Sequence, residues 1–189
     1  MKSRYLTNDE IARIQARLGL DGWLPFAVAL ETGLRISDVA ALTWRNVHGR
    51  RITYVAKKTR KPGEAIISSE LRVMLDTRRR AACSPWVFPS PQNPRRHITR
   101  QALWRRLKKA ADSVTNAAGV SPHSFRKVFG VNEYHEHGVR AVQTALQHTD
   151  VATTEIYALA DWELDAGAPL TRGDLPRILH YIADYLGKR

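Results

Sequence analysis

The stretch SPHSFRK, residues Ser121 to Lys127, contains the strongest local signal in this chain. Serine is a common N-cap and proline suits the first helical position, so the stretch predicts a helix that begins at Pro122. His123 then lies in the first turn, with Arg126 on the same face three residues later. Free backbone N–H groups and the helix dipole favour an anion at this end. An imidazole and a guanidinium there predict a phosphate site, and a capped surface helix with incidental basic residues is the alternative.

Three more residues have side chains suited to phosphate chemistry. Arg35 lies in TGLRIS, a tight junction between two expected helices, where packing of Leu34 and Ile36 would fix its guanidinium. His148 ends one expected helix, and Tyr157 follows nine residues later on the next. A tyrosine has an ordinary pKa of about 10, so it attacks a phosphate at neutral pH only where cations stabilise the phenolate and a base takes the proton. Taken singly, the arginine also fits a solvated turn, and the tyrosine fits a half-buried packing role.

The basic connector VAKKTRKPGE supplies the last candidate. A lysine on a hairpin can reach over a bound duplex and donate a proton to a leaving alkoxide. Lys58 is the candidate for this role and Lys57 is its rival. A solvated loop that touches only the DNA backbone is the structural alternative.

The composition indicates a globular protein with a polyanionic partner. The chain has 189 residues, of which 43% are hydrophobic, so it can bury one good core. Its 30 Lys+Arg against 18 Asp+Glu give a net charge of +12, which favours nucleic acid, although a basic soluble or ribosome-associated protein fits the charge alone. Cys83 is the single cysteine, which excludes an internal disulfide. No apolar run resembles a signal or reaches transmembrane length, so we expect a cytoplasmic or nucleoid-associated protein.

The spacing of the apolar residues predicts an α+β fold that is mainly α. Thr7 and Glu10 form a capping box for the first helix, Gly33 suits the end of the second, and Ser37 suits the cap of a short third helix. ITYV and EAII predict two antiparallel strands on either side of the basic connector. The expected helices span about residues 8–18, 23–32, 38–42, 69–80, 99–115, 122–137, 140–147 and 151–159. They predict a helical domain with a small antiparallel sheet over residues 1–160.

Five stretches resemble the tyrosine recombinase or phage integrase family, in the family's order and spacing. They are LTNDE near the start, ALETGLRISDVAALTW around Arg35, KKTRKPGEAIIS around Lys58, PHSFRKVFG and LQHTDVATTEIY. The resemblance covers about residues 5–159 and implies the DNA breaking-rejoining fold of that family. The His-x-x-Arg box with the nine-residue interval from histidine to tyrosine is specific. Two departures are Gln147, where the family usually has glycine, and Lys127, where many members have histidine.

The resemblance implies one catalytic set, made up of Arg35, Lys58, His123, Arg126, His148 and Tyr157. The tyrosine would attack the scissile phosphate and leave a 3′-phosphotyrosyl bond and a free 5′-hydroxyl. The two arginines would hold the non-bridging oxygens, and the lysine would protonate the departing 5′ oxygen. His123 would assist proton transfer at the tyrosine, and the second histidine would hydrogen-bond the phosphate. Because the phosphotyrosine conserves the energy of the broken bond, we expect no cofactor, metal or ATP.

The implied partner is double-stranded DNA, with self-association on it as a dimer or tetramer. The chain begins at the catalytic domain, so we expect that the family's N-terminal DNA-binding domain is missing. One rival function is relaxation of DNA by a type IB topoisomerase, although those enzymes usually carry lysine at the position of His123. Another rival is a non-catalytic DNA-binding protein of the same fold. A helix-turn-helix regulator would fit the basic helix but leave Tyr157 unexplained.

An acidic connector and a final helix are expected over residues 161–189. The acidic residues of the connector, which repel DNA, are Asp161, Glu163, Asp165 and Asp174. The helix, at about residues 175–186, has an apolar stripe made up of Leu175, Ile178, Leu179, Ile182 and Leu186. We expect the stripe to dock on a neighbouring protomer in trans, as C-terminal segments do in the recombinases that this chain resembles. Packing on its own domain is the alternative.

Deletion of the residues after Leu170 is expected to reduce assembly on DNA, because it removes the stripe, and to leave the fold of residues 1–160 intact. Thermal melting followed by circular dichroism reports the fold, and native gel electrophoresis of protein–DNA complexes reports the assembly. Unfolding or aggregation of the truncated chain at low concentration would show that the helix packs on its own domain instead.

Overall fold

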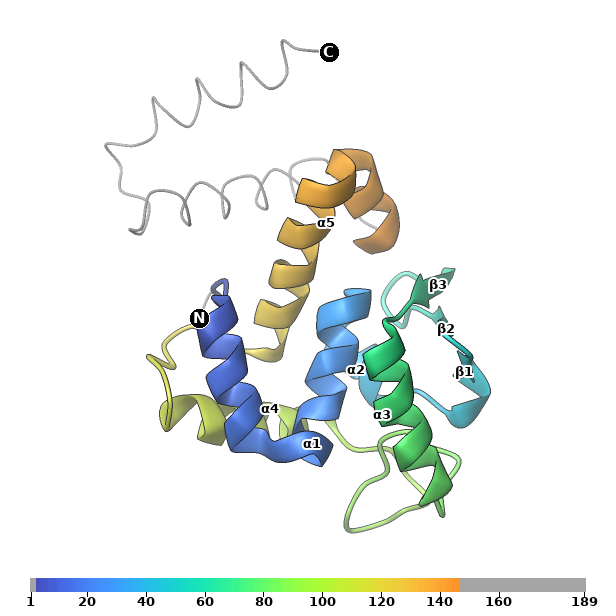
Figure 1. The fold of residues 1–189 in the computed structure, drawn as a ribbon. Coiled ribbons are helices and arrows are strands. Elements are labelled where there is room, and N and C mark those ends of the chain that lie inside the picture. Colours follow the sequence, from blue (N-terminus) through green and yellow to red (C-terminus); the bar gives the residue numbers. More distant parts are fainter. Residues whose placement is uncertain (1–2, 147–189) are drawn as a thin grey trace, which may run out of the picture.

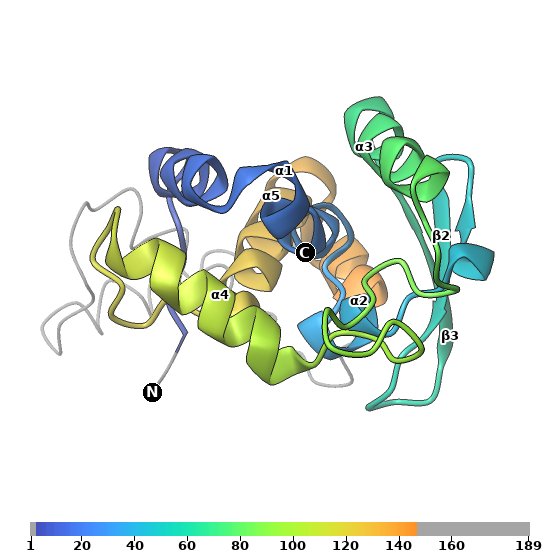
Figure 2. The same cartoon turned by 90° about the horizontal axis from the view of Figure 1, so that it is seen from below.

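Helices dominate residues 3–146, the part of the chain that this computed structural model describes (Figure 1). The elements in chain order are α1 (Asn8–Thr32), α2 (Ile36–Ala40), the 3-10 helix η1 (Trp44–Asn46), β1 (Val47–His48), β2 (Arg51–Val55), β3 (Pro62–Ile66), α3 (Ser69–Arg80), α4 (Arg100–Asp112) and α5 (Pro122–Leu146). The sheet and α3 lie on one side, and α4 lies on the other with the first half of α1 (Figure 2). The expected mainly helical fold with a small antiparallel sheet is confirmed.

The central helix α1 is bounded by the two signals that the sequence contains. Thr7 and Glu10 form the expected capping box, and Gly33 ends the helix in the left-handed conformation with φ 63°. The two helices expected here are confirmed as the two halves of α1, which non-helical backbone at Gly19, with φ 66°, separates. Its second half is buried, since Phe26 and Val28 have no exposed surface. This half therefore serves as the core against which the other helices pack.

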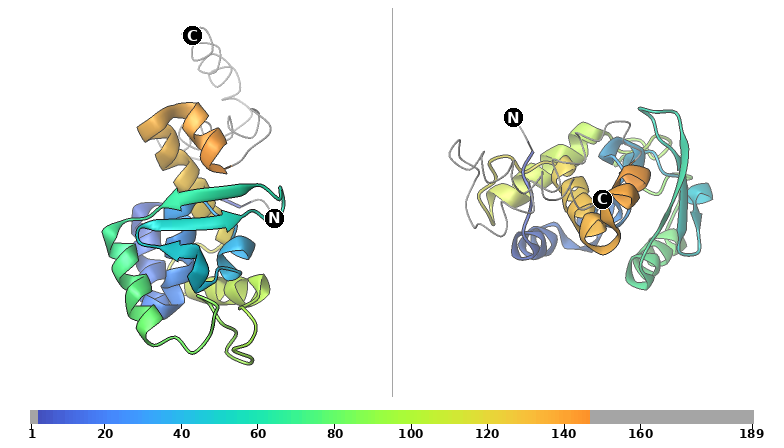
Figure 3. Two further views of the ribbon diagram at one scale, coloured as in Figure 1. Left: turned by 90° about the vertical axis from the view of Figure 1, so that its right-hand side faces the viewer. Right: turned by 90° about the horizontal axis from the view of Figure 1, so that it is seen from above.

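The sheet is a meander in the order β1-β2-β3, and it forms one side of the molecule (Figure 3). The strands β2 and β3 are the two expected ones, and they pair antiparallel with Thr53 opposite Glu64. The short strand β1 was not expected. It pairs over two residues, with Val47 opposite Ile52. The loop between β2 and β3 contains the lysines of the basic connector, so the hairpin presents them at one end of the sheet.

An aromatic cluster fixes α5 against α1. The ring centroid of Phe125 lies 5.6 Å from that of Trp23 and 5.3 Å from that of Phe26. All three side chains are buried, and Phe125 has no exposed surface. Aromatic side chains bury large apolar surfaces, and tilted or edge-to-face ring pairs at these separations add to the stabilisation. The cluster sets the position of the first turn of α5, where His123 and Arg126 lie.

The start of α2 differs from the expected one, whereas the break inside α5 agrees with the expectation. The N-cap of α2 is Arg35 and not Ser37, because the carbonyl of Arg35 already accepts from the N–H groups of Asp38 and Val39. The two helices expected over 122–137 and 140–147 are confirmed as the two halves of α5, which non-helical backbone at Gly138, with φ 78°, separates. At the start of α5, the backbone N–H of Ser121 donates to the hydroxyl of Ser124, the third residue of the helix.

Several expectations fall on residues outside the described part. They concern His148, Tyr157, the helix at residues 151–159, the acidic connector and the C-terminal helix, together with the boundary between the domain and its appendage. Within the described part, no helix is long and apolar enough to cross a membrane. Nucleoid association stays a prediction.

Glu10 ties the N-terminal segment to the connection that leads into α5. Its carboxylate accepts from Arg4 at 2.6 and 2.9 Å and from the hydroxyl of Thr115 at 2.5 Å. Arg4 also donates to the carbonyls of Asn116 and Ala118 at 2.7 and 3.0 Å. The hydrogen bond from Arg4 is the largest of the effects that lower the pKa of Glu10 to about 2. This carboxylate therefore stabilises the fold only while it is ionised.

We expect Glu10→Gln to lower the stability at neutral pH and to flatten its loss in acid. The pKa of Glu10 is about 2 in the folded chain against an ordinary value of 4.5. Its contribution is therefore complete above about pH 4.5 and is lost as the pH falls toward 2. Urea denaturation of both proteins at pH 7, 4.5 and 3 measures the effect.

Asp9→Asn is the matched control, because it removes a carboxylate of the same helical turn whose one ion pair, with Arg13, is exposed. An unchanged acid slope in Glu10→Gln would contradict the prediction. Equal changes in both variants would assign the effect to net charge.

Candidate functional site

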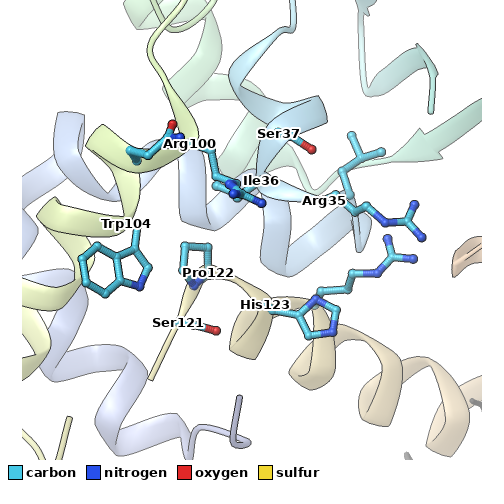
Figure 4. Close-up of a pocket in the computed structure, with 11 residues that line it drawn as sticks. Arg35, Ile36, Ser37, Arg100, Trp104, Ser121, Pro122 and His123 are labelled. Carbon is cyan, nitrogen blue, oxygen red and sulfur yellow. The ribbon is translucent and has the colours of Figure 1, made fainter. Parts of the chain in front are cut away.

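Arg35, His123 and Arg126 line one pocket of about 460 Å³ (Figure 4). Figure 4 shows the side chains of Arg35 and His123 pointing toward a common space, one from the start of α2 and the other from the first turn of α5. The other residues that line it are Leu34, Ile36, Ser37, Arg100, Gln101, Trp104, Ser121 and Pro122. Within the described part of the chain, no carboxylate lines this pocket. A concave site with several cations and no counter-charge is suited to an anion.

Arg126 forms the floor of this site rather than a mobile arm. Its side chain is buried, with 3% exposed. One terminal nitrogen donates to the carbonyl of Gly33, and the other donates to the carbonyl of Leu146 at 2.8 Å. These carbonyls end α1 and α5, and the C-terminal end of a helix carries partial negative charge. The guanidinium is therefore held in a fixed orientation by two helix ends, as preorganised binding of an anion requires.

The backbone at Gly33 has room for glycine alone. Its φ of 63° is strained for other residues, and a Cβ there would come within 2.7 Å of a methyl carbon of Leu146 and closer still to the ring of Phe129. The close approach of α5 to this residue brings the Gly33 carbonyl within reach of Arg126. The glycine read from the sequence as a helix end is thus also a packing requirement of the site.

No described residue neutralises the charge of Arg35. It is half-buried between Leu34 and Ile36, which are 3% and 9% exposed, so the expected packing on both sides is confirmed. Its side chain makes no hydrogen bond or ion pair with any residue in the described range. Burial of Leu34 and Ile36 fixes the backbone at Arg35, and its guanidinium can bind a ligand without first breaking a contact with a described residue.

His123 is neutral near physiological pH. Desolvation by the surrounding protein lowers its pKa to about 4, and the positive charges of Arg126, Lys127 and Arg35 act in the same direction. Because His123 also faces solvent in the open pocket, the neighbouring cations are needed, together with burial, to explain why its pKa is lowered. A neutral imidazole can accept a proton, and an anion bound among these cations would raise the pKa again.

Lys57 and Lys58 lie beside this pocket and not inside it. Both are exposed, and both line a second pocket of about 490 Å³, which shares Arg35 with the first. The other residues that line the second pocket are Ser37, Ala40, His97, Thr99, Arg100 and Gln101. Because both lysines face it, the choice between them stays open. Arg35 lines both pockets, so it connects the one that His123 lines to the one that the lysines line.

A buried carboxylate connects the lysine loop to the turn that carries Arg35. Asp38 is 7% exposed, and its Oδ1 accepts from the backbone N–H of Lys57 at 3.2 Å. Its Oδ2 is buried without a hydrogen-bond partner among the described residues. A buried carboxylate is costly unless nearby positive charge compensates it. From the sequence, Asp38 was expected only to begin a helix. Its position three residues after the candidate Arg35 was the one signal that could have indicated a role at the site.

Residues of α4 also belong to the site, and the sequence interpretation did not include them. Arg100, Gln101 and Trp104 line the first pocket, and the first two also line the second. The spacing of the apolar residues predicted this helix, but it does not show which part of the fold the polar face of the helix lies beside. His148 and Tyr157, the remaining members of the expected set, lie outside the described residues.

The sequence profile described as the Phage integrase family matches residues 4–163, which is most of the chain. The chain belongs to this family, so the resemblance seen in the five stretches is confirmed.

Individual relatives and solved structures agree. The tyrosine recombinase XerD of Bradyrhizobium diazoefficiens is 32% identical over 172 residues, which cover 82% of this chain and 54% of that protein. The XerA recombinase structure matches with a TM-score of 0.69 at 20% identity, over 96% of this chain and 66% of that one. A lambda integrase dimer bound to a COC′ core site matches at 0.67 and 16%, over 83% and 48%. These structures share the fold, and the chain spans about half the length of the curated relative.

We expect His123 in the free protein to titrate with a pKa near 4, well below the ordinary value of 6.5. Between these values the unfolded chain takes up the proton and the folded one does not, so this group disfavours folding progressively as the pH falls from about 6.5 to about 4. In Arg35→Gln the pKa should rise, because one positive charge is removed. Proton NMR of the imidazole Hε1 signal measures both values.

Inorganic phosphate should raise the same pKa in the wild-type chain. His48, which lines neither pocket, provides an internal reference signal. Titration of His123 at its ordinary value in the free protein, with no response to Arg35→Gln, would contradict the proximity of the cations.

Proposed function

We propose that the chain cuts and rejoins DNA as a site-specific recombinase through a 3′-phosphotyrosyl intermediate. The observation that supports this most is the pocket in which Arg35, His123 and Arg126 converge, with no carboxylate among the described residues that line it. A phosphodiester is an anion that accepts hydrogen bonds on two non-bridging oxygens, and planar guanidinium groups match that geometry. Membership of the family supplies the reaction class.

Tyr157 is the proposed nucleophile. Its hydroxyl oxygen forms a bond to the scissile phosphorus while the bond from phosphorus to the 5′ oxygen breaks, so one phosphodiester replaces another. The neutral imidazole of His123 takes the phenol proton, and Lys58 gives a proton to the departing 5′ oxygen. Attack by a 5′-hydroxyl of a second strand reverses these steps and rejoins the DNA. Neither a nucleotide nor a metal takes part in this sequence.

The two arginines stabilise the charge that the transition state places on the phosphoryl oxygens. Fixed donors contribute more than mobile ones, because they need no reorganisation when the charge develops. Arg126 is held by two carbonyls and meets this requirement, whereas Arg35 is positioned through its backbone, which lies between two buried residues. His148 completes the proposed set by donating a hydrogen bond to the phosphate.

Double-stranded DNA is the proposed substrate and partner. The net charge of +12 favours a polyanion, and α4 adds an exposed basic surface beside the pocket. The exposed cations of α4 are Arg100, Arg105, Arg106 and Lys109. A matching structure is that of a lambda integrase dimer on its core site, and we extend self-association on DNA, as a dimer or tetramer, to this chain. Docking of the C-terminal helix on a neighbour is part of the same proposal.

Tyr157→Phe is expected to abolish the covalent adduct between protein and DNA, because it removes only the attacking hydroxyl. Incubation with supercoiled plasmid, denaturation with detergent and digestion of the DNA would reveal the adduct by gel electrophoresis. The reaction should proceed in EDTA and without nucleotide. Tyr134→Phe is the matched control, since it removes another hydroxyl from a half-buried tyrosine that packs beside Val131.

An adduct that persists in Tyr157→Phe would refute the assignment of the nucleophile. A strict requirement for magnesium in strand cleavage would indicate a metal-dependent nuclease. Relaxation of the plasmid with no exchange between two DNA molecules would favour topoisomerase-like activity.

A further inference from the structure

Trp104 is a tryptophan whose ring is largely outside the hydrophobic core. It is 46% exposed, whereas Trp23 and Trp44 are 4% and 9% exposed. On the same helix, Leu103 and Leu107 have no exposed surface and supply the contacts to the core. A large ring left in water forgoes the stabilisation that burial would contribute. Trp104 differs from the other large exposed apolar side chains in the described part of the chain, because it lines the pocket of Arg35 and His123, where a bound ligand would meet its ring.

The position of Trp104 divides the pocket into two ends of different chemistry. Figure 4 shows Trp104 and Pro122 on one side and Arg35 and His123 on the other. The first end is apolar and the second is cationic. Arg100 lies one helical turn before Trp104 and lines the same pocket. A single phosphate would occupy the cationic end and leave the apolar end in contact with water.

A nucleotide has a shape and chemistry that suit both ends. Its phosphate carries the negative charge, and its deoxyribose and base are flat or weakly polar groups attached within a few bonds. Indole rings pack well on sugars and bases, and such a contact changes the affinity roughly tenfold or more. In an intact duplex the indole can reach the sugar and the exposed edge of the base without unstacking them.

We propose that Trp104 packs against the deoxyribose and base edge of the nucleotide whose phosphate is held by Arg35 and Arg126. This inference rests on the proposed function, because it assigns that phosphate to DNA. Trp104 makes an uncharged contact, and Arg100 contributes only charge. The two residues lie on the same face of α4. Substituting each of them in turn therefore separates the uncharged contact from the charged one at a single position of the site.

The first experiment compares two ligands of equal charge, methyl phosphate and thymidine 3′-monophosphate, by NMR titration of the full chain. The indole N–H signal of Trp104, assigned with Trp104→Phe, and the Hε1 signal of His123 report binding. The wild type should bind the nucleotide roughly tenfold more tightly. In Trp104→Ala that preference should disappear while the affinity for methyl phosphate stays within about twofold. Trp104→Phe should retain most of the preference.

Two control variants sharpen the comparison. Arg100→Gln should weaken both ligands by the same factor, because both have the same charge. Trp86→Phe alters another partly exposed tryptophan, one that meets His97 edge to face and does not line this pocket, and it should change neither affinity. Circular dichroism melting checks that each variant folds, as expected for surface positions.

The second experiment measures affinity for duplex DNA between 50 and 200 mM salt by fluorescence anisotropy. The slope of log affinity against log salt counts the phosphates that cations neutralise. Trp104→Ala should lower the affinity by a similar factor at every salt concentration and leave the slope unchanged. Arg100→Gln should reduce the slope by about one.

A nucleotide preference that survives in Trp104→Ala would overturn the inference while the phosphate site stands. A loss of salt slope in Trp104→Ala would also overturn it, because it would show a disturbed charge surface. Failure of the wild type to bind either small ligand, without a response at His123, would reject the phosphate site and the inference together.

Discussion

The guanidinium of Arg126 joins the C-terminal ends of the two longest described helices. Its nitrogens donate to the carbonyls of Gly33, which follows α1, and of Leu146, which ends α5. A buried cation is costly unless it has partners, and two helix ends with partial negative charge provide them. The last described residue of α5 is thereby fixed to the floor of the pocket. In the sequence, His148 follows two residues later. The residue proposed to hold the phosphate therefore also anchors the segment that leads to the rest of the proposed catalytic set.

Some residues of the pocket do not favour the stability of the fold, and packing of other residues offsets this. Arg35 has no partner among the described residues, His123 is kept neutral by its surroundings, and Trp104 remains exposed. Each of these departs from what stability alone would favour, and such departures concentrate at functional sites. The offset comes from nearby packing, above all the aromatic cluster of Trp23, Phe26 and Phe125. Because Phe125 precedes Arg126 directly, this packing lies next to the buried charge.

Local signals in the sequence predicted most helices and strands, and the reason is that each depends on neighbouring residues. The capping box of Thr7 and Glu10, the left-handed Gly33 and the strands around the basic connector all follow from contacts within a few positions. The errors have the same origin. Ser37 has the chemistry of a cap, but the backbone turns two residues earlier, where packing of Leu34 and Ile36 fixes the chain. The strand β1 is too short to show a periodic pattern.

The sequence by itself determined the family and indicated the type of chemistry that we propose, since it contains the residues of the proposed phosphate site in the family's order. Tertiary structure alone decided how they meet. Arg126 and Gly33 lie 93 residues apart in the chain, and no local pattern encodes that contact. Helical periodicity shows which face of α4 is apolar, but only the packing of α1 and α5 turns Arg100 and Trp104 toward the pocket. The burial of Arg126 and the link from Asp38 to the lysine loop arise likewise from contacts between distant segments. Such contacts form because the apolar surface of the whole chain is buried at once, which no short stretch of sequence specifies.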